Sequence, residues 1–370
     1  MFLRFSSAVA TIAALALATN VTAEGSFEEC VLVPSIPEDR RTDPDQLRVA
    51  TFNAEFLFTK GLGQLKCPGK DCEWKTQEAA MDHIEGIAKV VYDMDADIIQ
   101  LNEVEDCTAL KLLVKEVAKL GDDTYVPYII RGDDRFTAQN AAIITRVDPI
   151  DTISRVTERV EYPVPKSSCG KFPSQERKSK GVSKNILARF DVAGFSSPIT
   201  MIGVHFLARP QDTKRCFERE AQASVIAKQV EVARKAGDHV IVLGDYNDFS
   251  NEVLDIQSSL PISNVMGILA DAGMENIGNR VPQEERYSNW WDRNSDCVYR
   301  VPEEVSALDH IMMTKCLADQ ISTVSYGTEL FKMACGSPYS DHFPVIATLK
   351  SNGGSCSENQ KTGILVGGIK

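Results

Sequence analysis

Four short polar motifs each adjoin an apolar run in this chain, and this pairing restricts most strongly how the chain can fold. The motifs are Thr51-Phe52-Asn53, Leu101-Asn102-Glu103, Leu243-Gly244-Asp245-Tyr246-Asn247 and Ser340-Asp341-His342. The adjoining runs are rich in leucine and β-branched residues, as expected of buried strands. The sequence therefore predicts that four strand ends carry polar side chains into one shared pocket.

Strand-like and helix-like segments alternate from residue 47 to residue 350. Apolar runs predict strands at 47–58, 97–104, 126–131, 140–146, 185–192, 199–207, 239–243, 307–314 and 343–349. Helical periodicity predicts helices at 77–92, 108–120 and 217–236, whereas 155–184 and 274–304 are expected to be loops. The pattern indicates one α/β domain with mixed sheets over 47–350, preceded by an irregular arm at 24–46 and followed by a flexible tail at 351–370.

The first residues predict export. Arg4 precedes an apolar stretch, and Val21-Thr22-Ala23 offers small residues for a signal peptidase, so residues 1–23 are interpreted as a removed signal peptide. The chain has 10 cysteines, an even number that favours disulfides in an oxidising compartment. A zinc site is the weaker alternative because no Cys-x-x-Cys occurs, and the disulfide pairing stays open. We expect a soluble, secreted protein with no obligate protein partner.

The charge of the chain limits how it can bind a polyanion. A net charge of -12 gives no overall basic surface for nucleic acid. A local basic strip is expected in the loop at 155–184, from Lys166, Lys171, Arg177, Lys178, Lys180 and Lys184. The same residues can equally be a solvated loop. A polyanionic substrate would therefore need cations to mediate part of its contact.

The acidic motifs favour a hard cation and phosphate chemistry. Asp245 and Asn247 lie two residues apart after a strand, so their side chains can converge on one ligand. Glu103 ends another buried strand, where a carboxylate can bind Mg²⁺, or alternatively Mn²⁺ or Ca²⁺, more readily than zinc. Taken alone, each motif is also compatible with a turn or a solvated acid.

Two histidines could exchange protons with a substrate. His205 ends one apolar run and His342 opens the last one. Imidazoles gain and lose protons near neutral pH, as the hydrolysis of a phosphate ester requires. Asp309 could hold His342 in the useful tautomer.

Six motifs in register resemble the endonuclease/exonuclease/phosphatase superfamily, in its deoxyribonuclease-like, secreted nuclease branch. They are the four motifs above together with His205 and Leu308-Asp309-His310, and the resemblance covers residues 47 to 350. It implies a four-layer α/β sandwich, in which two packed, mostly antiparallel mixed sheets are flanked by helices. It also implies that the strand-end loops form the pocket.

The resemblance assigns roles residue by residue. It implies that Asn53, Glu103 and Asp341 hold the divalent cation, and that His342 with Asp309 is the catalytic pair. Asp245 and Asn247 resemble the pair that orients the nucleophile and binds phosphate, and His205 resembles the second histidine. The basic phosphate contact could be Lys184, which is ranked first, Arg131 or another residue of the long loop. Arg219 could reach a phosphate or could instead form a structural salt bridge.

These observations lead to three functional hypotheses. The first is a secreted, divalent-metal-dependent phosphodiesterase that hydrolyses DNA or RNA by in-line attack of water. The second is a sphingomyelinase-like or inositol-phosphate-directed hydrolase, for which Trp290 and Trp291 would supply an amphipathic surface. The third is a secreted binding protein that kept the fold without catalysis.

Overall fold

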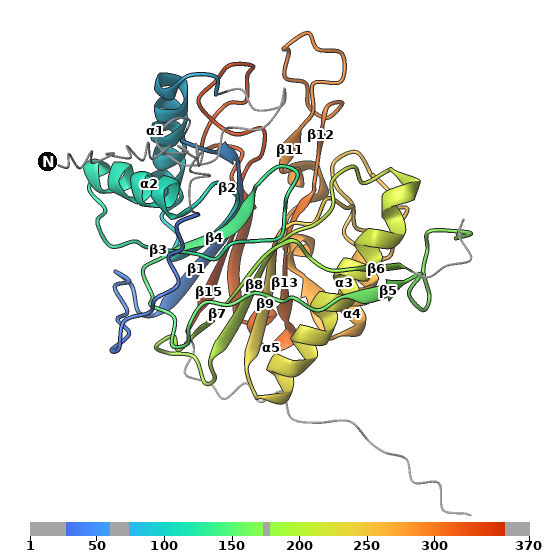
Figure 1. The fold of residues 1–370 in the computed structure, drawn as a ribbon, viewed down its shortest axis with the longest axis horizontal. Coiled ribbons are helices and arrows are strands. Elements are labelled where there is room, and N and C mark those ends of the chain that lie inside the picture. Colours follow the sequence, from blue (N-terminus) through green and yellow to red (C-terminus); the bar gives the residue numbers. More distant parts are fainter. Residues whose placement is uncertain (1–26, 60–73, 173–177, 352–370) are drawn as a thin grey trace, which may run out of the picture.

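Two β-sheets lie face to face at the centre of the molecule (Figure 1). The computed structural model describes residues 27–59, 74–172 and 178–351, so the expected signal peptide and nearly all of the expected tail lie outside the described residues. The six-stranded sheet has the order β14-β15-β1-β2-β4-β3 and the five-stranded sheet the order β10-β13-β9-β8-β7.

The bounds of the strands in these sheets follow the apolar runs closely. The first sheet contains β1 (Gln46–Leu57), β2 (Ile98–Val104), β3 (Val126–Ile129), β4 (Asn140–Thr145), β14 (Ile321–Tyr326) and β15 (Val345–Lys350). The second contains β7 (Lys184–Phe190), β8 (Ile199–His205), β9 (His239–Asp245), β10 (Met274–Asn276) and β13 (Asp309–Thr314). Within these sheets the pairs β1·β2 and β8·β9 are parallel and the others antiparallel. The predicted mixed, mostly antiparallel sheets are confirmed.

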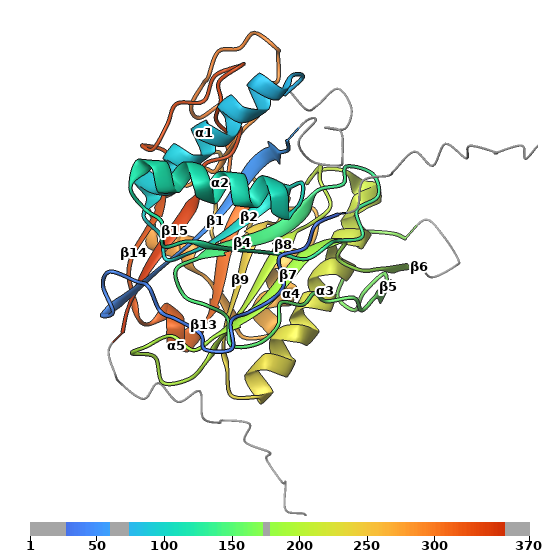
Figure 2. The same cartoon turned by 60° about the vertical axis from the view of Figure 1, so that its left-hand side comes forward.

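Helices cover the outer face of each sheet, which completes four layers (Figures 1 and 2). Helices α1 (Gln77–Met94) and α2 (Cys107–Leu120) lie on one side of the sheet pair, and α3 (Thr213–Lys235) and α4 (Val265–Asp271) lie on the other. Three apolar clusters fill the spaces between the layers. On β9, Ile241 and Leu243 enter the cluster between the sheets, and Val240 and Val242 enter the cluster under α3. Burial on both faces explains why this run shows no polar alternation.

Four features depart from the expected elements. The long loop at 155–184 contains a small hairpin of β5 (Val160–Tyr162) and β6 (Lys178–Lys180). The third helix begins at Thr213 rather than Phe217, because the Asp212 carboxylate accepts a hydrogen bond of 2.8 Å from the Lys214 amide as an N-cap. Helix α4 and strand β14 were not expected. Short elements also occur within or near the second expected loop: β11 (Asn289–Trp290), β12 (Val305–Ser306), α5 (Lys315–Ala318) and the 3₁₀ turns at Ile277–Arg280 and Gln283–Glu285.

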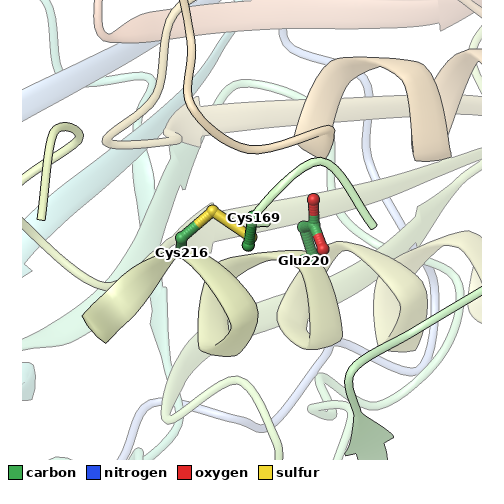
Figure 3. A group of neighbouring side chains, drawn as sticks. All are labelled: Cys169, Cys216 and Glu220. Carbon is green, nitrogen blue, oxygen red and sulfur yellow. A yellow bond between two sulfur atoms is a disulfide. The ribbon is translucent and has the colours of Figure 1, made fainter. Parts of the chain in front are cut away.

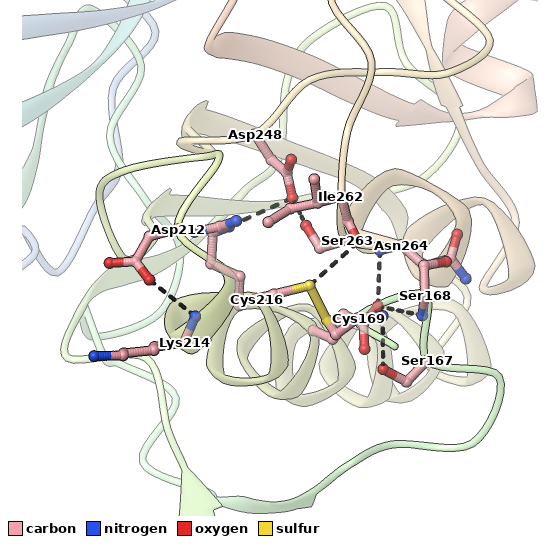
Figure 4. Close-up of a disulfide and its surroundings, with 12 residues drawn as sticks. Ser167, Ser168, Cys169, Asp212, Lys214, Cys216, Asp248, Ile262, Ser263 and Asn264 are labelled. Carbon is pink, nitrogen blue, oxygen red and sulfur yellow. Dashed lines mark hydrogen bonds and ion pairs between the residues drawn. A yellow bond between two sulfur atoms is a disulfide. The ribbon is translucent and has the colours of Figure 1, made fainter. Parts of the chain in front are cut away.

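Disulfides hold three surface segments to the body, and none of the cysteines in the described ranges is free. The pairs are Cys30–Cys107, Cys169–Cys216 and Cys297–Cys335. The first joins the N-terminal arm to the start of α2, and the second joins the loop after β5 to the first turn of α3 (Figure 4). The expected disulfides are therefore present, while Cys67, Cys72 and Cys356 lie outside the described residues. No helix within the described ranges has both the length and the apolar character to cross a membrane.

Candidate active site

The strand ends meet as the polar motifs predict. Asp245 at the end of β9 lies opposite His205 on β8 and opposite Asp309 on β13. Gly244 allows this close packing, because it has φ +144° and an added Cβ would lie 1.9 Å from the Val204 carbonyl oxygen. The glycine before Asp245 is therefore required by the approach of β8.

A shared amide links the carboxylates of the two sheets. The Asn53 Nδ2 group donates to Glu103 Oε1 and to Asp245 Oδ2, each over 3.2 Å. The other oxygen of Glu103 accepts a hydrogen bond of 3.1 Å from the Phe56 amide. The Asn247 amide and side chain both donate to Asp245, over 2.8 and 3.0 Å. Three of the predicted site residues, one from each of β1, β2 and β9, thus form one cluster, and Asn247 beside them orients Asp245.

His342 and Asp309 form a buried hydrogen-bonded pair. His342 Nδ1 lies 2.6 Å from Asp309 Oδ2, which also accepts a hydrogen bond of 2.8 Å from Ser288 Oγ. Asp309 has no exposed surface, and its second carboxylate oxygen has no hydrogen-bond partner. The Asn289 amide lies 3.2 Å from His342 Nε2. Asp309 therefore fixes the imidazole so that Nε2 is the nitrogen left to exchange a proton.

His205 lies on the other side of Asp245. Its Nε2 is 3.2 Å from Lys184 Nζ and 3.5 Å from Asp245 Oδ2. Lys184 also donates to Gln139 Oε1 over 3.1 Å. The structure thus brings the predicted Lys184 into the site, where its ammonium lies beside the second histidine.

The surroundings give the two histidines opposite charge preferences. Burial, together with the positive charge of Lys184, holds the pKa of His205 well below its usual value. Burial also opposes a charge on His342, but the carboxylates of Asp309 and Asp341 outweigh it and hold its pKa well above its usual value. The surroundings therefore favour the neutral form of His205 and the protonated form of His342.

Asp245 has an acidity unlike that of a surface aspartate. Burial, followed by the nearby charge of Asp309, raises its pKa to about 7. The Asn247 amide and His342 only partly offset this effect. A carboxylate with this pKa can accept a proton from water near neutral pH.

The loop before β15 joins Asp341 to this cluster through backbone contacts. Ser340 Oγ donates to the Asn53 carbonyl over 2.6 Å, and the Asp341 amide donates to Glu55 Oε2 over 2.9 Å. The side chain of Asp341 is 44% exposed, and its Oδ1 lies 3.9 Å from His342 Nε2. It therefore borders the opening of the site.

The donor set suits a hard divalent cation. Carboxylates outnumber the cationic groups in the cluster, and the charge of Asp309 adds to the effect of burial in raising the pKa of Asp245. Oxygen donors of this kind select Mg²⁺, Mn²⁺ or Ca²⁺. The oxygen atoms of Asn53, Glu103 and Asp341 thus have the chemistry that the expected cation needs, and their role as its ligands stays a prediction.

A second group of possible metal ligands does not fit a metal. Cys169, Cys216 and Glu220 lie together, but Figure 3 shows the two sulfurs joined in a disulfide, so they offer no thiolate. Glu220 Oε1 accepts hydrogen bonds from the Ser168 and Asn264 amides instead. This group holds the loops around α3 in place.

Arg219 does not contact the site, so its expected role in substrate binding is wrong. Its side chain has no exposed surface, and its guanidinium donates to the Arg209 and Pro210 carbonyls and lies 3.5 Å from Asp248 Oδ2. Asp248 in turn accepts a hydrogen bond from Ser263, beside the Cys169–Cys216 disulfide (Figure 4). Arg219 is a structural residue that anchors the loop after β8.

Sequence reasoning missed Ser288, Asn289 and Gln139, which contact Asp309, His342 and Lys184 of the candidate site. All three lie outside the apolar runs that marked the other motifs. The only local signal was the adjacent Trp290-Trp291 pair, which was considered for substrate contact. Their placement depends on pairing between distant segments, such as the bridge from Asn289 to His342.

Solved structures match the chain, whereas no protein-family model and no curated protein does. A 3'-5' exonuclease (NExo) from Neisseria meningitidis is 14% identical, with a TM-score of 0.51 over 82% of this chain and 100% of that chain. The 3' phosphatase NExo from Neisseria, bound to a product DNA hairpin, is 14% identical, with a TM-score of 0.52 over 82% and 99%. A further match, from Leptotrichia buccalis, is 12% identical, with a TM-score of 0.49 over 82% and 99%. At these identities the two matches with TM-scores above 0.5 establish the fold alone.

Proposed function

We propose that this chain, which has the endonuclease/exonuclease/phosphatase fold, is an exported phosphodiesterase that uses a divalent cation and acts on nucleic acid. The observation that carries this proposal is the placement of two buried imidazoles around the buried Asp245: His205 Nε2 lies 3.5 Å from Asp245 Oδ2, and His342 is hydrogen-bonded to Asp309, which lies opposite Asp245. A binding protein has no need of two imidazoles whose pKa values are shifted in opposite directions beside a carboxylate with a pKa of about 7.

The position of each side chain suits one role in the hydrolysis of a phosphodiester. Asp245, held by Asn53 and Asn247, would orient a water molecule and accept its proton as the water attacks phosphorus. His342 Nε2 would give a proton to the leaving oxygen, while Asp309 holds Nδ1. Lys184 would place a positive charge beside a phosphoryl oxygen. A cation bound by Glu103, Asp341 and Asn53 would supply neutralisation of the phosphoryl charge.

Nucleic acid is the proposed substrate class for two reasons. One neighbour of this fold carries DNA as its bound product. The expected export also separates the chain from intracellular signalling lipids. The net charge of -12 argues that cations and local basic residues mediate the contact.

The test is a substrate panel on the purified chain. Plasmid DNA, RNA, sphingomyelin and inositol phosphates would be incubated with Mg²⁺, Mn²⁺ or Ca²⁺, and again with EDTA. We expect hydrolysis of a nucleic acid that EDTA abolishes, and a loss of about 10²- to 10⁴-fold in the His342→Gln variant. Hydrolysis of sphingomyelin or inositol phosphates alone would contradict the proposed substrate, and unchanged turnover by His342→Gln would contradict the assigned acid.

Export is tested separately. We expect the chain to be recovered from the culture medium with Glu24 as its first residue. Retention inside the cell with residues 1–23 still attached would rule out the signal peptide.

A further inference from the structure

A cavity of about 670 Å³ adjoins the proposed reacting centre on the His342 side. Phe249, Trp290, Trp291 and Leu308 supply its apolar lining, and Asp341 lies at its border with the catalytic cluster. A volume in this range accommodates a ligand of the size of a nucleoside. The cavity is therefore large enough for a substituent of the phosphate rather than for the phosphate alone.

The wall of this cavity is fixed to the catalytic loop by backbone hydrogen bonds. The Trp290 amide donates to the Asp341 carbonyl over 2.9 Å, and the Phe343 amide donates to the Ser288 carbonyl over 2.7 Å. Strand β11, which carries Trp290, also pairs with β12. A ligand in the cavity would therefore be held at a constant position relative to His342.

The chemistry of the opening suits a flat ring attached to a phosphate. Trp291 is 67% exposed, and the guanidinium of Arg293 lies 5.8 Å from the centre of its ring. Arg209 is an exposed cation that also lines the cavity. An exposed indole stacks with nucleobases, and nearby arginines attract phosphate oxygens.

A second cavity, at the other end of the catalytic cluster, has a different character. It measures about 590 Å³ and is lined by Arg131, Asp133, Asp134, Arg135 and Asn140, among others. Thr137 donates to both Asp134 and Gln139, which connects this cavity to Lys184. Of these two cavities, the one beside His342 is lined by an exposed indole, so the two sides of the phosphate meet different surfaces.

We propose that the cavity at Trp291 binds the nucleobase of the nucleotide on one side of the reacting phosphate, by stacking on the indole. This inference rests on the proposed function for the position of the phosphate. It makes Trp291 a specificity residue that selects phosphates carrying a base over phosphates carrying only a sugar.

The experiment compares two ligands that differ only in the base. Isothermal titration calorimetry in Mg²⁺ would measure the Kd of thymidine 5'-monophosphate and of deoxyribose 5-phosphate for the purified chain. We expect the nucleotide to bind about ten-fold more tightly. Trp291→Ala should remove this preference without changing the affinity for deoxyribose 5-phosphate, and Trp291→Phe should retain most of it.

Tyr92→Ala is the matched control, because Tyr92 is a partly exposed aromatic residue on α1 that lines none of these cavities. Equal affinities for the two ligands, or an unchanged preference in Trp291→Ala, would overturn the inference. A loss of hydrolysis in Trp291→Ala that is seen with sphingomyelin vesicles and not with DNA or RNA would also overturn the inference. If the chain prefers the nucleotide but hydrolyses no phosphoester, the base-binding cavity is supported and the proposed function is wrong. If the chain hydrolyses nucleic acid without this preference, the proposed function is supported and the base-binding cavity is wrong.

Discussion

At the scale of single residues, the charge on His342 depends, among its charged neighbours, most strongly on Asp309, which has no exposed surface. Asp309 contacts Nδ1 over 2.6 Å, and it is the foremost of the charges that raise the pKa of His342 against the effect of burial. This dependence can be tested without removing the imidazole.

We predict that Asp309→Asn lowers kcat about 10²- to 10⁴-fold and moves the alkaline limb of the pH profile to lower pH. The sign follows because the variant lacks the charge that raises the pKa of His342, so the protonated acid is lost earlier as pH rises. The measurement is kcat/KM against pH for both proteins, with a thermal melt to show that the variant is folded. An alkaline limb at the wild-type position would contradict the role given to Asp309.

Asp245 gives a second prediction, in which stability and activity change in opposite directions. Its pKa is raised to about 7 in the folded chain, against about 3.9 in an unfolded one. Between these values the folded state holds a proton that the unfolded state has released, so the wild type loses stability as pH rises through this window.

The Tm of Asp245→Asn in EDTA should therefore fall less between pH 5 and pH 8 than the Tm of the wild type does. The variant should also have lost turnover. Melts at both pH values, beside the activity assay, measure this. A fall in Tm between pH 5 and pH 8 that is as large in the variant as in the wild type would contradict the raised pKa of Asp245.

The sequence predicted which residues gather in the candidate site best where these residues adjoin apolar runs. Asp245, Glu103 and His342 were found because burial of the neighbouring strand makes a polar end conspicuous. Arg219 was misassigned because sequence spacing does not show whether a guanidinium on a helix faces a ligand or the carbonyls of its own loop. Asn289 was not predicted, because its contact with His342 joins segments that are 53 residues apart and have no shared sequence pattern.

At the scale of elements, α1 packs directly on the loop that carries Ser340-Asp341-His342. An added Cβ at Gly86 would lie 2.3 Å from the Pro338 carbonyl oxygen. The same carbonyl lies 3.0 Å from His83 Nδ1, and His83 Nε2 lies 2.8 Å from the Ala54 carbonyl. The helix thus sets the distance between the end of β1 and the loop before His342.

We predict that Gly86→Ala destabilises the chain by about 1–3 kcal/mol through overpacking and also lowers activity. Chemical denaturation gives the free energy of unfolding, and the hydrolysis assay gives the rate at a temperature where both proteins are folded. Glu85→Ala, at an exposed position of the same helix, should change neither quantity appreciably. If the two variants behave alike, α1 does not position the loop.

The sequence predicted apolar strands and helices more accurately than polar or short ones. The strands of the sheet centres are continuous apolar runs, so β2, β8 and β9 were expected nearly at their true bounds. Hairpin β5–β6 lies in a polar and basic segment, and α4 has only 7 residues, so neither produced a periodic signal. Their formation depends on tertiary contacts, such as the packing of Tyr162 and Phe172 around α3.

At the scale of the whole molecule, the site joins the two sheets, because Asn53 and Glu103 come from one and Asp245 and Asp309 from the other. The carboxylates in this cluster repel one another across the interface between the sheets. A cation bound there would relieve this repulsion in the folded state alone, so binding should stabilise the entire fold.

We predict that Mg²⁺ raises the Tm of the EDTA-treated chain, with a gain in the free energy of unfolding of about 2.7 kcal/mol at a concentration one hundred times the Kd. Glu103→Gln should lose most of this gain because it removes a charged oxygen donor while keeping the hydrogen bond to the Phe56 amide. Glu231→Gln, at an exposed position on α3, is the matched control and should keep the full response. The measurement is a series of melts across Mg²⁺ concentrations, which needs no substrate. An equal rise in Tm in Glu103→Gln and in the control would show that the cation binds elsewhere. If Mg²⁺ raises the Tm of none of the proteins, the cluster does not need a bound cation to offset its negative charge.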